Sequence, residues 1–468
     1  MSIENDPKRI SRRRFLGTAA TGLSGLVLAA CGSSSGGSQT GGSSNASGST
    51  GGATAAAGAG GGETQITSGL KLDGAQIKWS TWGNPGEIQR FKEFTDEFNK
   101  ETGANAQLIP IPNDGYQQKI LTQLSGGTAP DVFYAGAEYM GQMIASNKII
   151  DLTERLNGPN SQSKPSDFSD GLWGGAKTAD GKIYGVTVDC NPMVFWYNKQ
   201  LLQDAGITTM PADMQKDGKW TWQAFQDMCK QVVAKGKRGF ILENWYGPLW
   251  GWATTNGGKV WDGDKFVANE DAKTKEGFKF VQDNLQSKLF TYSGSLPKGQ
   301  GIDAMFLSQQ VAFITAGRWL LPVFKKATNL QYDIVPWPTN TGKKIEPAPI
   351  PTAYMVQNAS AANPDQAFAF LTNFVSKNGQ IFRLQGGGNA VPAIKGADQV
   401  VSEGNNPPNW QAFLDAREIG YAEWAQQASI SGLDNDINTT LDAVWLKGGD
   451  IDATFNQIAD IVKKKKSA

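Results

Sequence analysis

Between residues 76 and 134, segments typical of strands alternate with segments typical of helices. Gln76–Trp82 (Q-I-K-W-S-T-W) alternates polar and apolar residues, as a half-buried strand does. Asn84 and Pro85 then offer a helix start, and apolar residues recur at helical spacing up to Phe98. A strand at 106–111, a helix at 116–124 and a strand at 131–134 follow. This order predicts an α/β fold with a mostly parallel sheet flanked by helices and a ligand crevice at the strands' carboxyl ends.

The first 31 residues have the pattern of an export leader. A basic segment containing Lys8, Arg9 and 12–14 precedes an uncharged stretch, 15–30, that is too short to span a bilayer. The sequence S-R-R-R-F-L at 11–16 resembles a twin-arginine signal, and L-A-A-C ending at Cys31 resembles a lipobox. We therefore expect cleavage before Cys31 and its lipidation, which would anchor the protein to the outer face of the cell membrane. An uncleaved anchor with an ordinary cysteine is the alternative.

The segment after Cys31 is predicted to be a disordered tether over residues 32–65. From Gly32 to Gly62 it contains almost only Gly, Ser, Ala and Thr, with no charged and no large apolar side chain. Such a segment cannot offset its ordering entropy by burial. Its root-mean-square reach would be roughly 30 Å, so a globular body could move over the membrane surface.

The composition of the remaining chain limits what it can be. About 400 residues exceed what one hydrophobic core usually supports, which predicts two lobes. The 44 basic residues balance 44 acidic ones, which argues against a nucleic-acid partner. The chain has no histidine, which excludes Ser-His-Asp catalysis and histidine-ligated zinc, and we expect no metal and no cofactor. Cys190 and Cys229 form either a disulfide or two small buried hydrophobes, and the sequence leaves both open.

Five segments in order resemble the family-1 extracellular solute-binding proteins of ABC importers, over about 77–462. They are A-P-D-V at 129–132 with I-I-D-L at 149–152, G-K-I-Y-G-V at 181–186, W-Y-N-K at 196–199 with A-G at 205–206, W-T-W-Q-A-F at 220–225 and A-G-R-W at 316–319. The resemblance implies a sugar-binding protein with the two-lobed type II periplasmic-binding-protein fold. Its partners would be a sugar ligand and membrane permease subunits, and we expect a monomer.

On that fold, residues 73–188 and 345–390 would form one lobe, and 191–340 and 391–468 the other. Asn191 and the proline-rich run 336–351 would lie where the chain crosses between them. The chain departs from the family pattern twice. Thr352-Ala353 replaces a Gly-Gly pair, and Asn191 replaces a carboxylate of maltose-binding relatives. The identity of the sugar therefore does not transfer.

A sugar site needs flat aromatic rings and fork-shaped polar groups, and 15 Trp and 10 Tyr are available. We predict ten residues at the ligand: Trp82, Asn84, Glu87, Glu138, Asp189, Asn191, Trp245, Tyr246, Arg318 and Trp319. The resemblance points to the four aromatic residues, Asn84 and Glu138, and the others are chosen because their polar groups could bind hydroxyls. Trp245, Tyr246 and Trp250 form an aromatic cluster in the sequence. We predict that this cluster belongs to a loop rather than a helix, because Gly247 and Pro248 interrupt it.

Seven of these candidates also have a structural explanation. Trp82 could be a core residue, Asn84 and Glu87 a helix cap, and Glu138 a solvated acid in a first helical turn. Asp189 and Asn191 suit a hinge turn, and Arg318 could pair on the surface. Four further tryptophans are expected in the core or on a lobe surface: Trp196, Trp220, Trp222 and Trp445.

Two other functions remain open. A binding protein for a polyamine would need several acids among the aromatics, whereas one for a phosphorylated polyol would use Arg318 or helix N-termini. A glycoside hydrolase would need two carboxyl groups across a glycosidic bond, for which Glu138 and Asp189 are candidates. The resemblance and the tether favour binding without catalysis.

Overall fold

The computed structural model describes residues 65–67, 69–83, 85–298 and 300–467. All of them belong to the compact unit from Gly61 to Ala468. The predicted leader, Cys31, nearly all of the predicted tether and the candidate ligand residue Asn84 lie outside the described residues. In the part of the chain that is described, no helix is both long and apolar enough to cross a bilayer.

The first of two five-stranded sheets is built mainly from the N-terminal part of the body. Its strand order is β2 (Asn105–Pro110), β1 (Gln76–Thr81), β3 (Val132–Gly136), β12 (Thr352–Gln357) and β4 (Val186–Cys190). Only β12 runs against the other four strands. The predicted mostly parallel sheet is therefore confirmed, with one antiparallel strand that arrives from far along the chain.

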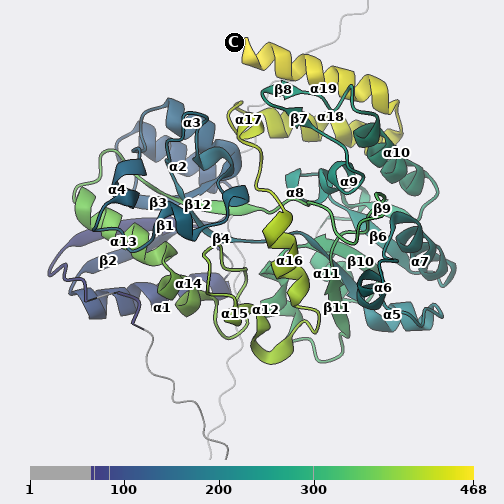
Figure 1. Cartoon of the computed structure of the whole chain (residues 1–468), viewed down its shortest axis with the longest axis horizontal. Coiled ribbons are helices and arrows are strands. Elements are labelled where there is room, and N and C mark those ends of the chain that lie inside the picture. Colours follow the sequence, from purple (N-terminus) through teal and green to yellow (C-terminus); the bar gives the residue numbers. More distant parts are fainter. Residues whose placement is uncertain (1–64, 68, 84, 299, 468) are drawn as a thin grey trace, which may run out of the picture. The chain divides into compact units, whose positions relative to one another are not determined.

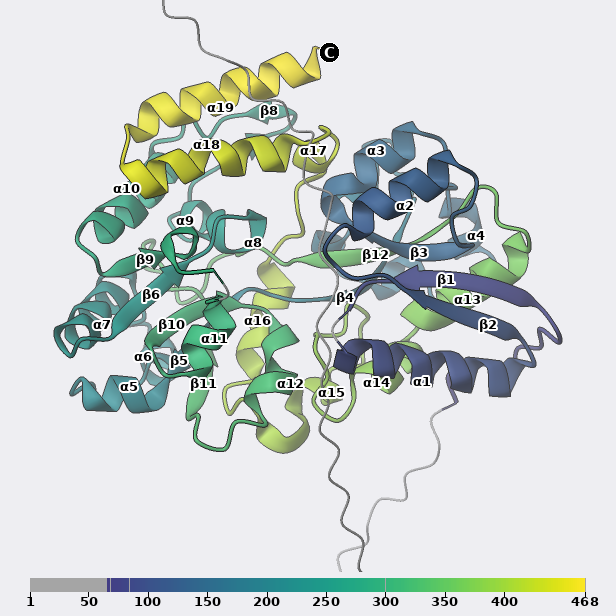
Figure 2. The same cartoon turned by 180° about the vertical axis from the view of Figure 1, so that it is seen from behind.

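Helices cover both faces of this sheet. α1 (Pro85–Thr102), α13 (Pro364–Val375) and α14 (Lys377–Leu384) lie on one side, and α2 (Tyr116–Ser125) and α3 (Met140–Ala145) on the other (Figures 1 and 2). The phenylalanines predicted for the apolar face of α1 meet those of α13, with the rings of Phe94 and Phe374 4.9 Å apart and those of Phe98 and Phe370 5.0 Å apart. This aromatic packing buries the stripe that the helical spacing predicted.

The second sheet has the order β11 (Tyr332–Val335), β5 (Val194–Asn198), β10 (Val311–Ala316), β6 (Arg238–Leu242) and β9 (Phe290–Tyr292). Here β5 alone runs against the others. α7 (Trp222–Ala234) packs on β6, and α10 (Ala272–Gln286) packs on β9. The predicted cap of α7 is confirmed, because the Thr221 hydroxyl accepts the amide of Ala224 at 3.2 Å. The C-terminal helices α18 (Leu433–Lys447) and α19 (Ile451–Lys466) contact α10.

The chain passes from the first sheet to the second between β4 and β5, and it returns between β11 and β12. The passing segments are hydrogen-bonded to one another. Asn191 N donates to Pro351 O at 3.0 Å, and Ile350 N donates to Tyr421 O at 2.7 Å. Three stretches from distant parts of the sequence thus run side by side between the sheets. The residue limits of the two lobes stay a prediction.

The structure corrects one sequence interpretation and resolves another. Residues 245–250 are not an irregular loop, because Tyr246–Leu249 forms the short helix α8 and Gly251–Thr254 forms α9, with Trp250 fully buried between them. Cys190 and Cys229 are free, buried thiols in different core clusters rather than a disulfide. Burial raises the pKa of both thiols, so they act as small hydrophobes. The tryptophans expected in the core, at 196, 220, 222 and 445, are buried.

Candidate functional site

A cavity of about 280 Å³ lies where strands of the two sheets present their ends. Its walls come from the turn after β3, the start of β12, the segment after β6, the stretch before α17 (Ala425–Ala428) and helix α18. The residues that line it are Ala137, Glu138, Trp245, Tyr246, Pro351, Thr352, Glu423, Asp434 and Asn438. Because parallel strands end at the same edge of a sheet, residues from distant parts of the sequence meet here.

Glu138 extends into this cavity from the 3-10 turn that follows β3. The residue is exposed toward the cavity, but the closely packed protein groups around it displace part of its water. This desolvation, with a smaller contribution from the negative charge of Asp434, raises the pKa of Glu138 to about 7. Near neutral pH its carboxyl group can therefore either accept or donate a hydrogen bond.

Trp245 supplies the cavity's principal aromatic surface. The residue is half-buried, and its indole lies over Gly247, where a side chain would collide with the ring. Its Nε1 donates to Glu243 at 3.2 Å, and burial raises the pKa of Glu243 to about 6. Trp319, which follows β10, lies beside Trp245 with ring centroids 6.2 Å apart. The hydrogen bond and the glycine together hold the Trp245 ring in place.

Tyr246 closes another side of the cavity and is 8% exposed. Its hydroxyl donates to the main-chain oxygen of Tyr421 at 3.0 Å. The Tyr421 ring in turn stacks on Trp424, with centroids 4.8 Å apart and planes tilted by 16°. The segment 421–424 is therefore tied to Tyr246 through the Tyr421 backbone, and it places Glu423 in the lining of the cavity.

Several other residues predicted at the ligand contact protein groups instead. Asp189 pairs with Arg383 at 3.0 Å, and burial raises the pKa of Asp189 despite that partner. The side-chain oxygen of Asn191 accepts a hydrogen bond from the main-chain amide of Arg318 at 2.9 Å. The Arg318 guanidinium is fully buried and donates to the main-chain oxygens of Ala390 and Val400 at 2.8 and 2.9 Å. These contacts hold segments of the fold together.

The two remaining candidates of the first sheet are also in contact with protein groups. Trp82 packs edge-on against Tyr116 and Tyr134, with centroids 4.9 and 5.3 Å away. Glu87, near the start of α1, accepts a hydrogen bond from Asn389 Nδ2. The cavity thus brings together Glu138, Trp245 and Tyr246, with Trp319 adjoining, while its lining does not include Trp82, Glu87, Asp189, Asn191 or Arg318.

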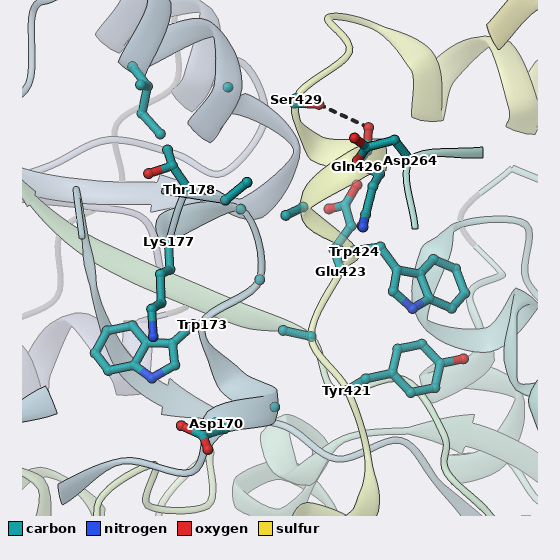
Figure 3. A pocket seen from close by; sticks show the side chains of 18 of the residues that line it. Asp170, Trp173, Lys177, Thr178, Asp264, Tyr421, Glu423, Trp424, Gln426 and Ser429 are labelled. Carbon is teal, nitrogen blue, oxygen red and sulfur yellow. Dashed lines mark hydrogen bonds between the residues drawn. The ribbon is translucent and has the colours of Figure 1, made fainter. Parts of the chain in front are cut away.

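A wider cavity of about 830 Å³ adjoins the first, and Glu423 lines both. Trp173 and Lys177 stand on one wall, and Tyr421 and Trp424 on the other (Figure 3). A ligand longer than one ring could therefore extend from the smaller cavity between two aromatic walls.

Sequence reasoning missed Glu423, Asp434 and the aromatic pair Tyr421 and Trp424. The sequence Y-A-E-W at 421–424 sets an acid between two aromatic residues, which is a signal for a sugar site. It lies outside the five segments that carried the family resemblance, so no motif directed attention to it.

The chain matches the family model described as bacterial extracellular solute-binding protein over residues 82–381. Among curated relatives, the erythritol/L-threitol-binding protein of Mycolicibacterium smegmatis is 27% identical over 286 residues, which are 56% of this chain and 51% of that protein. The maltodextrin-binding protein MdxE of Bacillus subtilis is 23% identical, over 54% of this chain and 58% of that protein. The alignments thus span little more than half of these relatives.

Solved structures match over most of the chain. The substrate-binding protein Lmo0181 of Listeria monocytogenes, in complex with cycloalternan, superposes with a TM-score of 0.74 at 20% identity, covering 84% of this chain and all (100%) of that one. The GacH receptor of Streptomyces glaucescens superposes with a TM-score of 0.70 at 18% identity, covering 84% and 99%. At these identities the likeness concerns the fold, which is that of type II periplasmic binding proteins.

Proposed function

This chain belongs to the bacterial extracellular solute-binding proteins, and from that premise we propose that it captures a sugar for an ABC importer and releases it unchanged. The observation that carries the proposal is the cavity in which the Trp245 ring lies with the carboxyl group of Glu138 and the Tyr246 side chain. Sugar rings stack their C–H faces on indoles, and carboxyl groups hold their hydroxyls. The names of two relatives, an erythritol/L-threitol-binding protein and a maltodextrin-binding protein, support a ligand with several hydroxyl groups.

Binding would be coupled to closure of the two sheets over the ligand. The cavity takes walls from both sheets, and hydrogen-bonded chain segments at Asn191, Pro351 and Tyr421 pass between them. Such connecting segments can absorb a hinge rotation while each sheet keeps its own packing. An importer would then recognise the closed form, in which both halves contact the sugar.

A phosphorylated ligand fits this cavity poorly. None of the described residues that line it is Lys or Arg, and Arg318 already donates to two buried carbonyl oxygens. Phosphate recognition needs such donors or an exposed helix N-terminus. The acidic lining therefore favours hydroxyl or amine groups over anions.

We assign no catalytic step to the chain. Of the two carboxyl groups considered for glycoside hydrolysis, Asp189 is held by Arg383 and lies outside the cavity lining, so it does not face Glu138 across a bound sugar. The matching family consists of binding proteins. We propose further that the protein acts as a monomer, is exported through the twin-arginine signal and is anchored by lipid on Cys31.

A thermal-shift screen of the purified body, without leader and tether, tests the function. The panel contains mono-, di- and oligosaccharides, polyols, polyamines and phosphorylated polyols. A ligand present at 100 times its dissociation constant stabilises the native state by about 2.7 kcal/mol, so a true sugar ligand must raise the melting temperature. Sugar recovered after prolonged incubation should be intact. A rise with phosphorylated polyols alone, or cleavage of the sugar, would contradict the proposal.

A further inference from the structure

Three carboxyl groups share the smaller cavity. Glu138 enters from the first sheet, Glu423 from the segment before α17, and Asp434 from the first turn of α18. Asp434 accepts a hydrogen bond from the side-chain amide of Gln427. Since no described lining residue is Lys or Arg, the walls of this cavity offer no positive charge to these acids.

Glu423 has a buried oxygen without a partner. The residue is 5% exposed and lines both cavities, and its Oε1 has no hydrogen-bond donor among the described residues. The carboxyl group of Glu423 also shares a hydrogen bond with the carboxyl group of Asp434. A buried acceptor without a donor destabilises the unliganded protein, so this position favours a ligand that brings a donor.

Within the smaller cavity, the described groups around these acids are all negative or neutral. Burial, and then Asp434 and Glu138, raise the pKa of Glu423 well above its ordinary value. The other titratable groups that interact with the cluster are three tyrosines, at 139, 246 and 354, and each has a raised pKa. Lys177 lines the wider cavity and stands on the wall opposite Glu423 (Figure 3). A cation entering the smaller cavity would therefore relieve both repulsion and the missing hydrogen bond.

The aromatic residues complete a site for a cation. Trp245 and Tyr246 line the same cavity as the three acids. Indole and phenol rings attract a desolvated cation through their negative faces. A neutral sugar would use the rings but would leave the acids without a counter-charge.

We propose that the ligand of this cavity presents a protonated amine to Glu423, Asp434 and Glu138. This inference rests on the proposed sugar-binding function and narrows it to sugars that carry an amino group. A linear polyamine offers the same chemistry from a different source, so the experiment includes one.

Isothermal titration with matched ligand sets tests the inference at pH 7. Each set contains a sugar, its amino derivative and the N-acetylated form of that derivative, for glucose, for galactose and for the β-1,4 disaccharide of glucose. We expect an amino sugar to bind at least tenfold more tightly than both of its neutral counterparts. The preference should shrink at pH 5, below the pKa of Glu138, where that carboxyl group holds its proton.

Two isosteric variants test which residues bind the amine. Glu423→Gln and Asp434→Asn keep the side-chain shape and should each reduce the amine preference at least fivefold. Asp436→Asn removes one charge from the same helix but affects a surface pair with Lys465 at 3.0 Å, so it should keep the preference. Melting temperatures of all variants confirm folding, and Asp434→Asn alone is sufficient if Glu423→Gln does not fold.

The outcomes separate the inference from the function. Equal binding of neutral and amino sugars would overturn the inference and leave the sugar-binding function standing. Tight binding of spermidine without any sugar would support the amine site and contradict the sugar function. Absence of binding by every amine probe would overturn the inference.

Discussion

The indole rings of Trp245 and Trp319 lie with their centroids 6.2 Å apart, although one follows β6 and the other follows β10. These two strands are parallel neighbours in the second sheet. Their carboxyl ends therefore place the two tryptophans side by side, and Trp245 lines the cavity. Trp245 thus shares this cavity with the acids contributed by other segments, and Trp319 packs beside it.

Replacing Trp245 by alanine should weaken sugar binding at least tenfold, which corresponds to about 1.4 kcal/mol. The ring would no longer stack on the ligand, while the fold should persist because the residue is half-buried. Trp319→Ala should have a similar effect by releasing Trp245. Titration calorimetry measures both. Trp410→Ala provides the control, because Trp410 is half-buried but lines neither cavity. Unchanged affinity in both variants would remove the pair from the site.

Arg318→Met should lower stability rather than remove a ligand contact. The buried guanidinium, whose pKa burial lowers to about 10, donates to the carbonyl oxygens of Ala390 and Val400. Hydrogen bonds from a charged donor contribute about 1.5–3 kcal/mol each. We therefore expect a loss of at least 2 kcal/mol in urea unfolding. A stable variant with lost sugar binding would show instead that Arg318 contacts the ligand.

Glu138 should make the unliganded protein less stable as the pH rises. Its pKa in the folded state is about 7, above its ordinary value of 4.5, so the folded state binds the proton more tightly than the unfolded state. Its stabilising contribution is complete below about pH 4.5 and is lost as the pH rises through 7. Glu138→Gln should remove this part of the dependence. Unfolding free energies of both proteins between pH 4 and 8 test this, and parallel curves would contradict it.

Cys31→Ser should release the protein from the membrane. The lipobox predicts that acyl chains on Cys31 provide the anchor. Partitioning into detergent and incorporation of labelled fatty acid should occur in the wild-type chain and disappear in the variant. Cys190→Ser, which changes a buried thiol, should retain the label. Labelling that survives in Cys31→Ser would refute the lipidation site.

The fold was predictable because periodicity is a local property. The strand at Gln76 and the helices beginning at Pro85, Tyr116 and Trp222 appear close to where their spacing and caps place them. The antiparallel strand β12 was not predictable, because its partners β3 and β4 are distant in sequence.

The candidate site was predictable only in part, because a motif fixes a residue's position and not the direction of its side chain. Gly317-Arg318-Trp319 places two candidates next to each other, yet Trp319 lies beside Trp245 while Arg318 extends into the core. Glu423 and Asp434 reach the cavity from a part of the chain without recognised motifs. Only the tertiary structure brings them to Glu138.

The proposed binding site can be checked in a crystal structure of the complex with the tightest-binding sugar. We expect a sugar ring in the cavity lined by Glu138, Trp245 and Tyr246, stacked on the Trp245 indole and hydrogen-bonded to at least one of the acids. A sugar bound elsewhere on the protein, with this cavity filled only by water, would contradict it.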